Sequence, residues 1–226
     1  MIKIAIAGSH GKMGKRIIAL AEKDKAITVV SEFDVGTDAE REIAKCDILI
    51  DFTAPQATVE HVKTAEHLKK GIVIGTTGLS KEENEAIQRT SKNIPIVISP
   101  NMSVGVNLLF KLCQDTARTL SKDYKVSMRE VHHIYKKDSP SGTAKRLADL
   151  VALEHKIPAA EIPIESIREG EVVGDHKVMF ESDEEVIELF HSAKSRDTFA
   201  AGALKAAKFL AGKKSGLFSM RDVLGI

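Results

Sequence analysis

Hydrophobic and polar positions alternate in blocks along the first hundred residues. Short continuous runs of Ile, Val and Ala are separated by longer stretches in which apolar residues recur with helical spacing. Continuous apolar runs are typical of strands covered on both faces, and strands that alternate with helices predict a doubly wound parallel sheet. The expected strands are residues 2–7, 27–33, 47–52, 71–75 and 94–99, and the expected helices are residues 12–24, 38–45, 56–69 and 81–92.

The pattern changes after residue 103, where strand-like runs follow one another without helical stretches between them. Consecutive strands without crossover helices predict an antiparallel or mixed sheet, and hence a second domain of the α+β class. The expected helices are residues 104–120, 142–156 and 197–210, and the expected strands are residues 125–132, 162–168, 176–180 and 185–191. We therefore expect a domain of residues 1–102 completed by 197–226, with residues 103–196 inserted as the second domain.

Composition and charge exclude several classes of protein. The 33 Lys and Arg residues balance the 32 Asp and Glu residues to a net charge of +1, which excludes a globally basic nucleic-acid binder. Cys46 and Cys113 are too few for a disulfide framework or a sulfur-rich metal site. No apolar run approaches a membrane span, and the initial strand leaves no room for a signal peptide. The expectation is a cytoplasmic protein without nucleic-acid or membrane partners.

A glycine-rich turn follows the first expected strand. Glycines at positions 8, 11 and 14 permit a tight turn and a close approach of the backbone to a pyrophosphate, which the helix start then receives. The spacing departs from the usual G-x-G-x-x-G, and alone it is equally consistent with a plain connecting turn. Its position after the first strand, and Asp34 at the end of the second strand 20 residues after Gly14, favour nicotinamide-dinucleotide binding.

Asp34 also bears on the choice of cofactor. Its carboxylate is placed to meet the ribose 2′-hydroxyl of NADH and would repel a 2′-phosphate, and residues 35–37 supply no cation. Lys12 in the glycine turn partly offsets that repulsion. We expect a preference for NADH, with NADPH as a possible second cofactor.

Residues 130–145 hold two histidines, two lysines and a helix start. Pro140 favours a helix beginning at Ser141, and the first turn of that helix carries no acid, so an external carboxylate can bind there. Each feature also has an ordinary structural interpretation, such as a solvated charge run or a simple N-cap. Adjacent histidines on a strand face opposite ways, which argues against a metal site. His132 and Lys136 would lie about 13 Å apart on a straight strand and converge only if the chain bends.

The motifs described above, taken together, match a known family. The chain resembles the 4-hydroxy-tetrahydrodipicolinate reductase (dihydrodipicolinate reductase) family from end to end, most specifically in the His-His-x-x-x-Lys-x-Asp-x-Pro-Ser-Gly-Thr run. Other matching segments are residues 8–14, 51–58, 75–78, 100–107, 195–202 and 215–224. The resemblance implies a Rossmann-like α/β fold with an inserted substrate-binding and oligomerisation domain, a homotetramer, and reduction of a cyclic dicarboxylate in the diaminopimelate route to lysine.

The resemblance also implies roles for individual residues. His132 matches the catalytic acid/base and Lys136 the proton-donating lysine, while Arg196 lies in a hinge segment near the substrate. Hydride delivery to an electron-poor ring leaves a carbanion or enamine to be protonated, which suits such donors. The substrate carboxylates are assigned to His133, Ser141, Gly142 and Thr143. The cofactor is assigned to Gly8, Ser9, His10, Gly11, Lys12, Met13, Gly14, Asp34, Phe52, Gly75, Thr76, Thr77, Pro100, Asn101 and Met102, with no metal ligand.

One departure from the family pattern and two competing functions stay open at the level of the sequence. The chain is shorter than many family members between the second and third strands, near the adenosine. A different dehydrogenase of amino-acid metabolism, acting for example on aspartate semialdehyde or homoserine, would share the cofactor fold but lack the histidine–lysine run. A non-catalytic NADH sensor would bind the cofactor without turnover.

Overall fold

The computed structural model describes residues 1–226, apart from the side chain of Ser121. The chain forms two compact units, Met1–Val104 with Phe199–Gly225 and Gly105–Thr198 with Ile226. We call them the first and the second unit. The predicted assignment of a cofactor domain and a substrate domain stays a prediction here.

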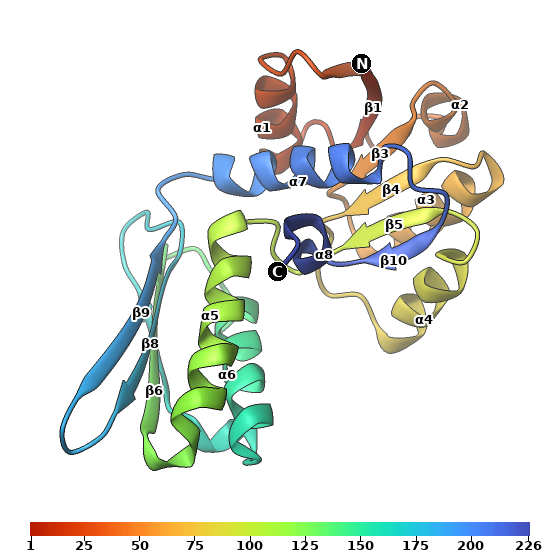
Figure 1. The fold of residues 1–226 in the computed structure, drawn as a ribbon. Helices are drawn as coiled ribbons and strands as arrows, with labels where there is room; N and C mark the ends of the chain where they lie inside the picture. Colours follow the sequence, from red (N-terminus) through yellow and green to blue (C-terminus); the bar gives the residue numbers. More distant parts are fainter. The chain divides into compact units, whose positions relative to one another are not determined.

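The first unit is built on a parallel sheet of six strands in the order β10-β5-β4-β3-β1-β2 (Figure 1). Its central strands are buried throughout their length, as their continuous apolar runs predict. The order reverses between β1 and β3, and in such sheets ligands bind at this point, beyond the carboxyl ends of the strands. The strands are β1 (Ile2–Ala7), β2 (Ile27–Phe33), β3 (Ile48–Asp51), β4 (Gly71–Ile74), β5 (Pro95–Ile98) and β10 (Gly216–Phe218).

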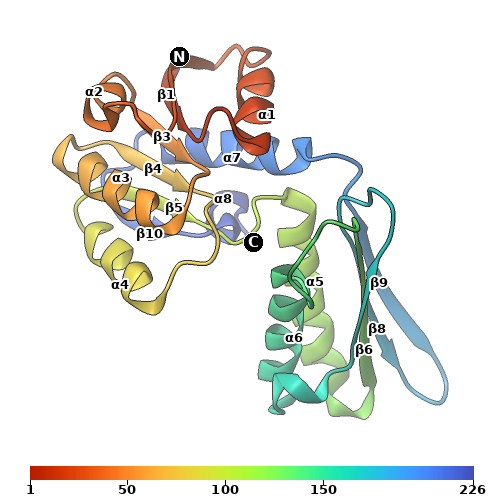
Figure 2. The ribbon, with the colours of Figure 1, turned by 180° about the vertical axis from the view of Figure 1, so that it is seen from behind.

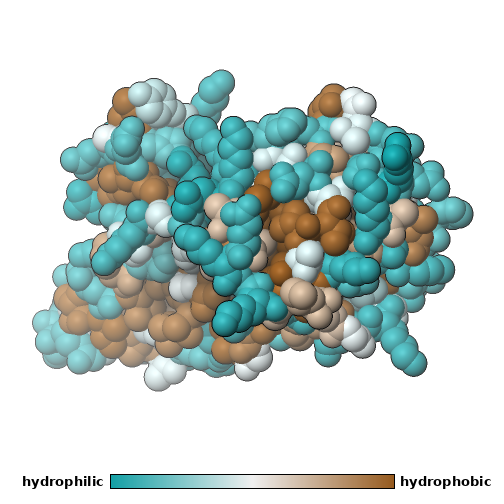
Figure 3. All heavy atoms as spheres, turned by 90° about the horizontal axis from the view of Figure 1, so that it is seen from above, coloured by the Kyte–Doolittle hydropathy of each residue, from teal (hydrophilic) through white to brown (hydrophobic). Residues whose placement is uncertain are grey.

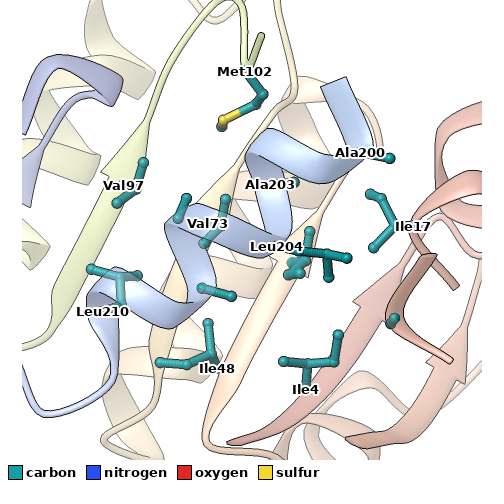
Figure 4. Packing of buried hydrophobic residues seen from close by; sticks show 14 of the residues in the cluster. Ile4, Ile17, Ile48, Val73, Val97, Met102, Ala200, Ala203, Leu204 and Leu210 are labelled. Carbon is teal, nitrogen blue, oxygen red and sulfur yellow. The ribbon is translucent and has the colours of Figure 1, made fainter. Parts of the chain in front are cut away.

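Helices cover both faces of this sheet, which confirms the doubly wound prediction (Figure 2). One apolar core joins α1 and α7 to the strands, with Leu204 and Ala203 of α7 pointing toward Ile4 and Val73 (Figure 4). A second core lies on the opposite face, beneath α3 and α4. The helices are α1 (Lys12–Ala21), α2 (Ala39–Ala44), α3 (Pro55–His67), α4 (Lys81–Thr90), α7 (Asp197–Leu210) and α8 (Met220–Leu224).

Gly202 allows α7 to approach the segment that follows β5. A Cβ atom at this position would lie 1.7 Å from the carbonyl oxygen of Met102, a distance that no side chain can occupy. Glycine in a helix interior costs about 1 kcal/mol relative to alanine. Here it allows α7 to pack closely against the backbone of Met102. Met102 itself is buried in the core beneath α7.

The second unit packs two helices on one face of a mixed four-stranded sheet (Figures 1 and 2). β6 pairs in parallel with β7 and antiparallel with β8, and β8 pairs antiparallel with β9, which confirms the predicted mixed sheet. The register sets Glu130 of β6 directly opposite His176 of β8. The elements are α5 (Val104–Leu120), β6 (Lys125–His132), α6 (Gly142–His155), β7 (Ile164–Arg168), β8 (Asp175–Glu181) and β9 (Val186–Ser192), with short 3-10 helices at Ser121–Asp123 and Ala159–Glu161.

The chain beyond α7 is more ordered than the predicted short tail. β10 extends the parallel sheet beside β5. α8 begins at Met220, and its N-cap is Ser219, whose backbone N–H donates to Asp222 in a capping box. The sequence indicates this helix start by a capping-box pair, Ser219 and Asp222, which lie three positions apart. A three-residue strand, however, is too short to show a periodic pattern.

The surface mixes hydrophilic and hydrophobic side chains on the face drawn in Figure 3. Among the residues described here, no helix has the length and apolar character needed to cross a membrane.

Both cysteines are free and buried. Burial raises the pKa of Cys46 to about 11 and that of Cys113 to about 12, so both thiols are protonated at neutral pH.

Candidate active site

The glycine turn lies at the point where the strand order reverses. Gly8 has a φ of +78°, and a Cβ atom there would lie 2.5 Å from the carbonyl oxygen of Phe52, which follows β3. A Cβ atom at Gly14 would lie 2.2 Å from the carbonyl oxygen of Gly8. The glycines thus let the ends of β1 and β3 and the start of α1 meet, and that start carries no acidic residue in its first turn.

Asp34 lies at the end of β2 beside this turn. Its carboxylate accepts hydrogen bonds from the backbone N–H of Val35 at 2.9 Å and of His10 at 3.2 Å. These two bonds hold the pKa of Asp34 below its ordinary value, so the side chain is an anion at neutral pH. The structure therefore brings Asp34 to the glycine turn, in the place where a ribose hydroxyl would be recognised.

A buried polar cluster joins the residues that follow β3 to the residues that follow β4. Asp51, which is fully buried, accepts hydrogen bonds from the Thr53 backbone N–H at 2.9 Å and from the Thr76 hydroxyl at 3.2 Å. Its other carboxylate oxygen lies 2.8 Å from Nδ1 of His61 on α3. The cluster fixes Phe52 and Thr76 on either side of it, and the sequence did not indicate His61 as a partner.

Gly75 and residues 99–103 follow β4 and β5 and include residues that were predicted to bind the cofactor. A Cβ atom at Gly75 would lie 2.2 Å from the Phe52 ring, so the glycine makes room for that ring. Ser99 donates its hydroxyl to the Asn101 carbonyl at 2.7 Å, and the side chain of Asn101 accepts from the Ser103 backbone N–H at 2.9 Å. Pro100 and Thr77 are exposed beside these ordered residues.

These features fit a nicotinamide dinucleotide. The residues around the glycine turn suit the pyrophosphate, because side-chain-free backbone is kept at the start of α1. Asp34 suits the adenosine ribose, and Phe52, Gly75 and Met102 follow the strands at whose ends the nicotinamide would lie.

In the second unit, three titratable side chains meet on the helix-covered face of the sheet. Glu130 and His132 lie two positions apart on β6 and so share a face, and His176 lies on β8 opposite Glu130. The Glu130 Oε2 atom lies 2.6 Å from Nδ1 of His132, and the His132 and His176 rings meet edge to face at 5.1 Å. All three are buried.

The start of α6 touches the same cluster. Ser141 caps the helix by accepting the Ala144 backbone N–H at 3.2 Å, which confirms the predicted helix start. Its hydroxyl lies 3.3 Å from Nε2 of His176, and its backbone N–H donates to Oε1 of Glu130 at 3.2 Å. The first turn contains no acid, as predicted, but Glu130 approaches the cap from a neighbouring strand.

The chain turns immediately after His132, and this turn supplies the bend that a convergence of His132 and Lys136 requires. The Lys136 backbone N–H donates to the His133 carbonyl at 3.1 Å, and its ammonium pairs with Asp138 at 2.7 Å. His133 is half-buried beside Tyr135. Gly142 and Thr143 form the first turn of α6, and Arg196 lies half-buried between β9 and α7.

Burial governs the charge of the two clustered histidines. It lowers the pKa of His132, and the charges of Lys136 and Arg168 add to that effect, while Glu130 opposes it. Burial and the nearby His132 lower the pKa of His176 to about 3, so that ring is neutral. Burial alone would raise the pKa of Glu130, but its hydrogen bonds and the neighbouring cations hold it below the ordinary value. The cluster therefore contains an anion beside a titratable imidazole.

A metal ion is a further possibility for this cluster, because ligand atoms of Glu130, His132 and His176 lie within 4.8 Å of one another. Two ligands of one tetrahedral zinc ion lie about 3.3 Å apart. The carboxylate and imidazole atoms are closer, at 2.6 Å, and the Arg168 guanidinium lies 3.1 Å from the same carboxylate. This arrangement suits proton exchange better than metal binding.

Sequence reasoning did not single out Glu130, Arg168 or His176. The sequence does contain a signal for Glu130, because period-two alternation places it on the same strand face as His132 and the buried Met128. His176 and Arg168 come from strands more than 35 positions away, and only the register of the sheet joins them to the site.

Comparisons with known proteins identify relatives of this chain. Residues 2–102 match the family described as dihydrodipicolinate reductase, N-terminus, and residues 105–224 match dihydrodipicolinate reductase, C-terminus. The chain is 41% identical to the 4-hydroxy-tetrahydrodipicolinate reductase of Aromatoleum aromaticum (strain DSM 19018 / LMG 30748 / EbN1), covering 100% of this chain and 96% of the relative. It is 42% identical to the enzyme of the same name from Aquifex aeolicus (strain VF5), covering 100% and 99%.

Solved structures show the same fold. A dipicolinate-bound dihydrodipicolinate reductase from Paenisporosarcina sp. TG-14 superimposes with a TM-score of 0.82 at 23% identity, covering 97% of each chain. An amine dehydrogenase from Mycobacterium smegmatis superimposes with a TM-score of 0.67 at 10% identity, covering 97% of this chain and 95% of that one. The two-domain architecture is thus one that dehydrogenases of different specificity share.

Fold and site together define an NAD(P)H-dependent oxidoreductase. The chain belongs to the 4-hydroxy-tetrahydrodipicolinate reductase (dihydrodipicolinate reductase) family. Its role is therefore that of a reductase in the diaminopimelate route to lysine.

Proposed function

We propose that the chain reduces 4-hydroxy-tetrahydrodipicolinate to tetrahydrodipicolinate with loss of water, using the residues assigned above. The observation that carries the assignment is the single cluster formed by His132, Glu130 and the start of α6. It places a titratable imidazole beside a helix N-terminus, which is the combination that a carboxylate-bearing substrate in need of a proton requires.

The substrate is a small cyclic dicarboxylate. The first turn of α6, at Gly142 and Thr143, offers backbone N–H groups and a positive helix end to one carboxylate. His133 and Arg196 supply polar and cationic side chains for binding. The relative from Paenisporosarcina was solved with dipicolinate bound, which supports a planar dicarboxylate as the ligand class.

His132 and Lys136 are the proton donors that we assign to the reaction. The nicotinamide, when bound, supplies the hydride. The chain's own part is to hold the substrate and to protonate the carbon left electron-rich by reduction. The His132 imidazole lies 2.6 Å from the Glu130 carboxylate, and the Lys136 ammonium is held by Asp138 at 2.7 Å. Either group can act as the general acid.

The cofactor is NADH in preference to NADPH. Asp34 is an anion held by two backbone N–H groups, so it can accept a hydrogen bond from a ribose hydroxyl and repels a phosphate at the same position. The glycine turn binds the pyrophosphate of either cofactor.

An assembly and a location are proposed as well, on the strength of the resemblance to the family. We assign a homotetramer formed through the sheet of the second unit, whose face away from α5 and α6 carries half-buried and exposed side chains. Light scattering coupled to size-exclusion chromatography tests the assembly. We infer a cytoplasmic location from the same resemblance to a family of biosynthetic reductases.

The decisive experiment couples the protein to the reaction that makes its substrate. Aspartate semialdehyde, pyruvate and the preceding synthase are mixed with NADH, and the absorbance of NADH is followed after the protein is added. We expect NADH consumption that depends on all components and is inhibited by pyridine-2,6-dicarboxylate. Cofactor binding without consumption would instead support a sensor, and consumption with aspartate semialdehyde or homoserine alone would support a different dehydrogenase.

A further inference from the structure

Glu130 is a fully buried carboxylate to which the proton transfer assigns no step. Its Oε2 atom lies 2.6 Å from Nδ1 of His132. Its Oε1 atom accepts hydrogen bonds from the Ser141 backbone N–H at 3.2 Å and from the Arg168 guanidinium at 3.1 Å. One side chain therefore touches both the imidazole assigned as general acid and the cap of the helix assigned to the substrate carboxylate.

We propose that Glu130 is a positioning residue that keeps Nδ1 of His132 protonated, so that Nε2 is the atom that gives its proton to the substrate. It does so while holding the start of α6 through its second oxygen. The proposal rests on the role of His132 given under the proposed function, and it adds the atom that acts and the residue that selects it.

The tautomer follows from the chemistry of the pair. An ionised carboxylate only accepts hydrogen bonds, so the ring nitrogen that faces it is the one that carries a hydrogen. The other nitrogen, Nε2, then holds the proton to be transferred in the imidazolium and the lone pair afterwards. This nitrogen lies toward Gly174, where a Cβ atom would be 3.0 Å away, so the absence of a side chain leaves space beside it.

The cations around His132 disfavour its protonated form, and the Glu130 carboxylate counteracts them. Lys136, in the turn after β6, and Arg168, on β7, are cations whose charges disfavour the imidazolium, and His176 on β8 is a neutral ring against it. Glu130 is the group that favours the charged ring. Its removal is therefore expected to lower the pKa of His132 further.

Arg168 extends the same arrangement to the second donor. Its guanidinium donates to Glu130 and, at 2.6 Å, to the backbone carbonyl of Asp138, whose carboxylate pairs with Lys136. Glu130 and Asp138 are thus joined through one cation. The positions of His132 and Lys136 depend on each other through this link.

The test is Glu130→Gln, which keeps the length and one acceptor oxygen for Ser141 and Arg168 but turns an amide N–H toward Nδ1. We expect kcat to fall about 10²-fold, at the low end of what general acid catalysis contributes, with little change in the KM for NADH. The alkaline limb of the kcat profile should move to lower pH, because the imidazolium has lost its anion. Glu130→Asp should restore the position of that limb in part.

Glu161→Gln, an exposed carboxylate in a 3-10 helix of the same unit, is the matched control and should leave both readouts unchanged. A Glu130→Gln enzyme with kcat within twofold of the original and the same alkaline limb would overturn the proposal.

A measurement on the unaltered protein covers the case in which Glu130→Gln does not fold. Nitrogen NMR of protein labelled with 15N-histidine reports the tautomer of neutral His132, assigned by its loss in His132→Gln. We expect the hydrogen on Nδ1, and a hydrogen on Nε2 would overturn the proposal. If His132→Gln keeps its kcat, the proton-donor role fails instead, whatever tautomer the spectrum shows.

Discussion

Gly174 faces the outer nitrogen of the His132 ring so closely that a methyl group at position 174 would lie 3.0 Å from Nε2 and 3.3 Å from Cδ2. Gly174→Ala should therefore push the ring from its place beside Glu130. A displacement of a few tenths of an ångström is expected to lower kcat about tenfold, since misplacement by 1 Å costs about 10²-fold. Steady-state kinetics check this, with the KM for NADH as the internal control. An unchanged kcat would contradict the proposal that Nε2, the nitrogen that lies toward Gly174, donates the proton to the substrate.

The two proton donors can be separated from cofactor binding by substitution. His132→Gln and Lys136→Ala should each lower kcat by two orders of magnitude or more, because general acid catalysis contributes about 10²- to 10⁴-fold. The affinity for NADH, measured by fluorescence titration, should change little, since both residues belong to the second unit. Lys137→Ala is the control, because Lys137 is an exposed neighbour of the same type. Unchanged kcat in both variants would refute the assigned roles.

Cofactor choice should depend on the charge at position 34. Asp34→Ser removes the anion and should raise the ratio of kcat/KM for NADPH over that for NADH at least tenfold, since one close charge repulsion of about 1.4 kcal/mol corresponds to that factor. Asp38→Ser is a matched control, because Asp38 is the exposed N-cap of α2 and serine caps a helix equally well. A native enzyme that strongly prefers NADPH would contradict the argument.

His176 should make the folded state sensitive to acid. Its pKa is lowered to about 3 by burial and by His132, whereas an unfolded histidine titrates near 6.5. Between these values the unfolded chain binds a proton that the folded chain does not, so stability falls as the pH drops below about 6.5, by up to about 1.4 kcal/mol per pH unit. Urea unfolding from pH 7 to pH 4.5 should show a shallower loss for His176→Gln than for the original protein. His67→Gln, at an exposed site, is the matched control.

Much of the first unit could be predicted because its strands and helices differ in period and are bounded by glycine, proline or polar residues. The limits of β1 and β2 are as predicted, and those of several other elements moved by one to three positions, as with the first helix, which ends at Ala21 and not at residue 24. The close approach of Gly202 to Met102 could not be foreseen, since it depends on how α7 packs and not on local pattern. The same is true of His61, which reaches Asp51 from one face of α3.

The second unit shows why the site was only partly predictable. His132, Lys136 and Ser141 lie within ten positions of one another, so a local motif contains them. Glu130 shares a strand with His132, whereas Arg168 and His176 come from other strands, and His176 joins Glu130 only because of the antiparallel register of β6 and β8. A sequence alone gives neither strand order nor register where the chain lacks hairpin signals, and so it cannot say which side chains face a histidine.

The two buried cysteines make this enzyme convenient for site-specific labelling. Because Cys46 and Cys113 are inaccessible and protonated, thiol reagents have no native target in the folded protein. A single cysteine introduced at Val35, which is 99% exposed and adjoins Asp34, would carry a fluorophore at the proposed adenosine end of the cofactor site. The enzyme can thus report the arrival of its own cofactor in real time without any prior removal of natural thiols.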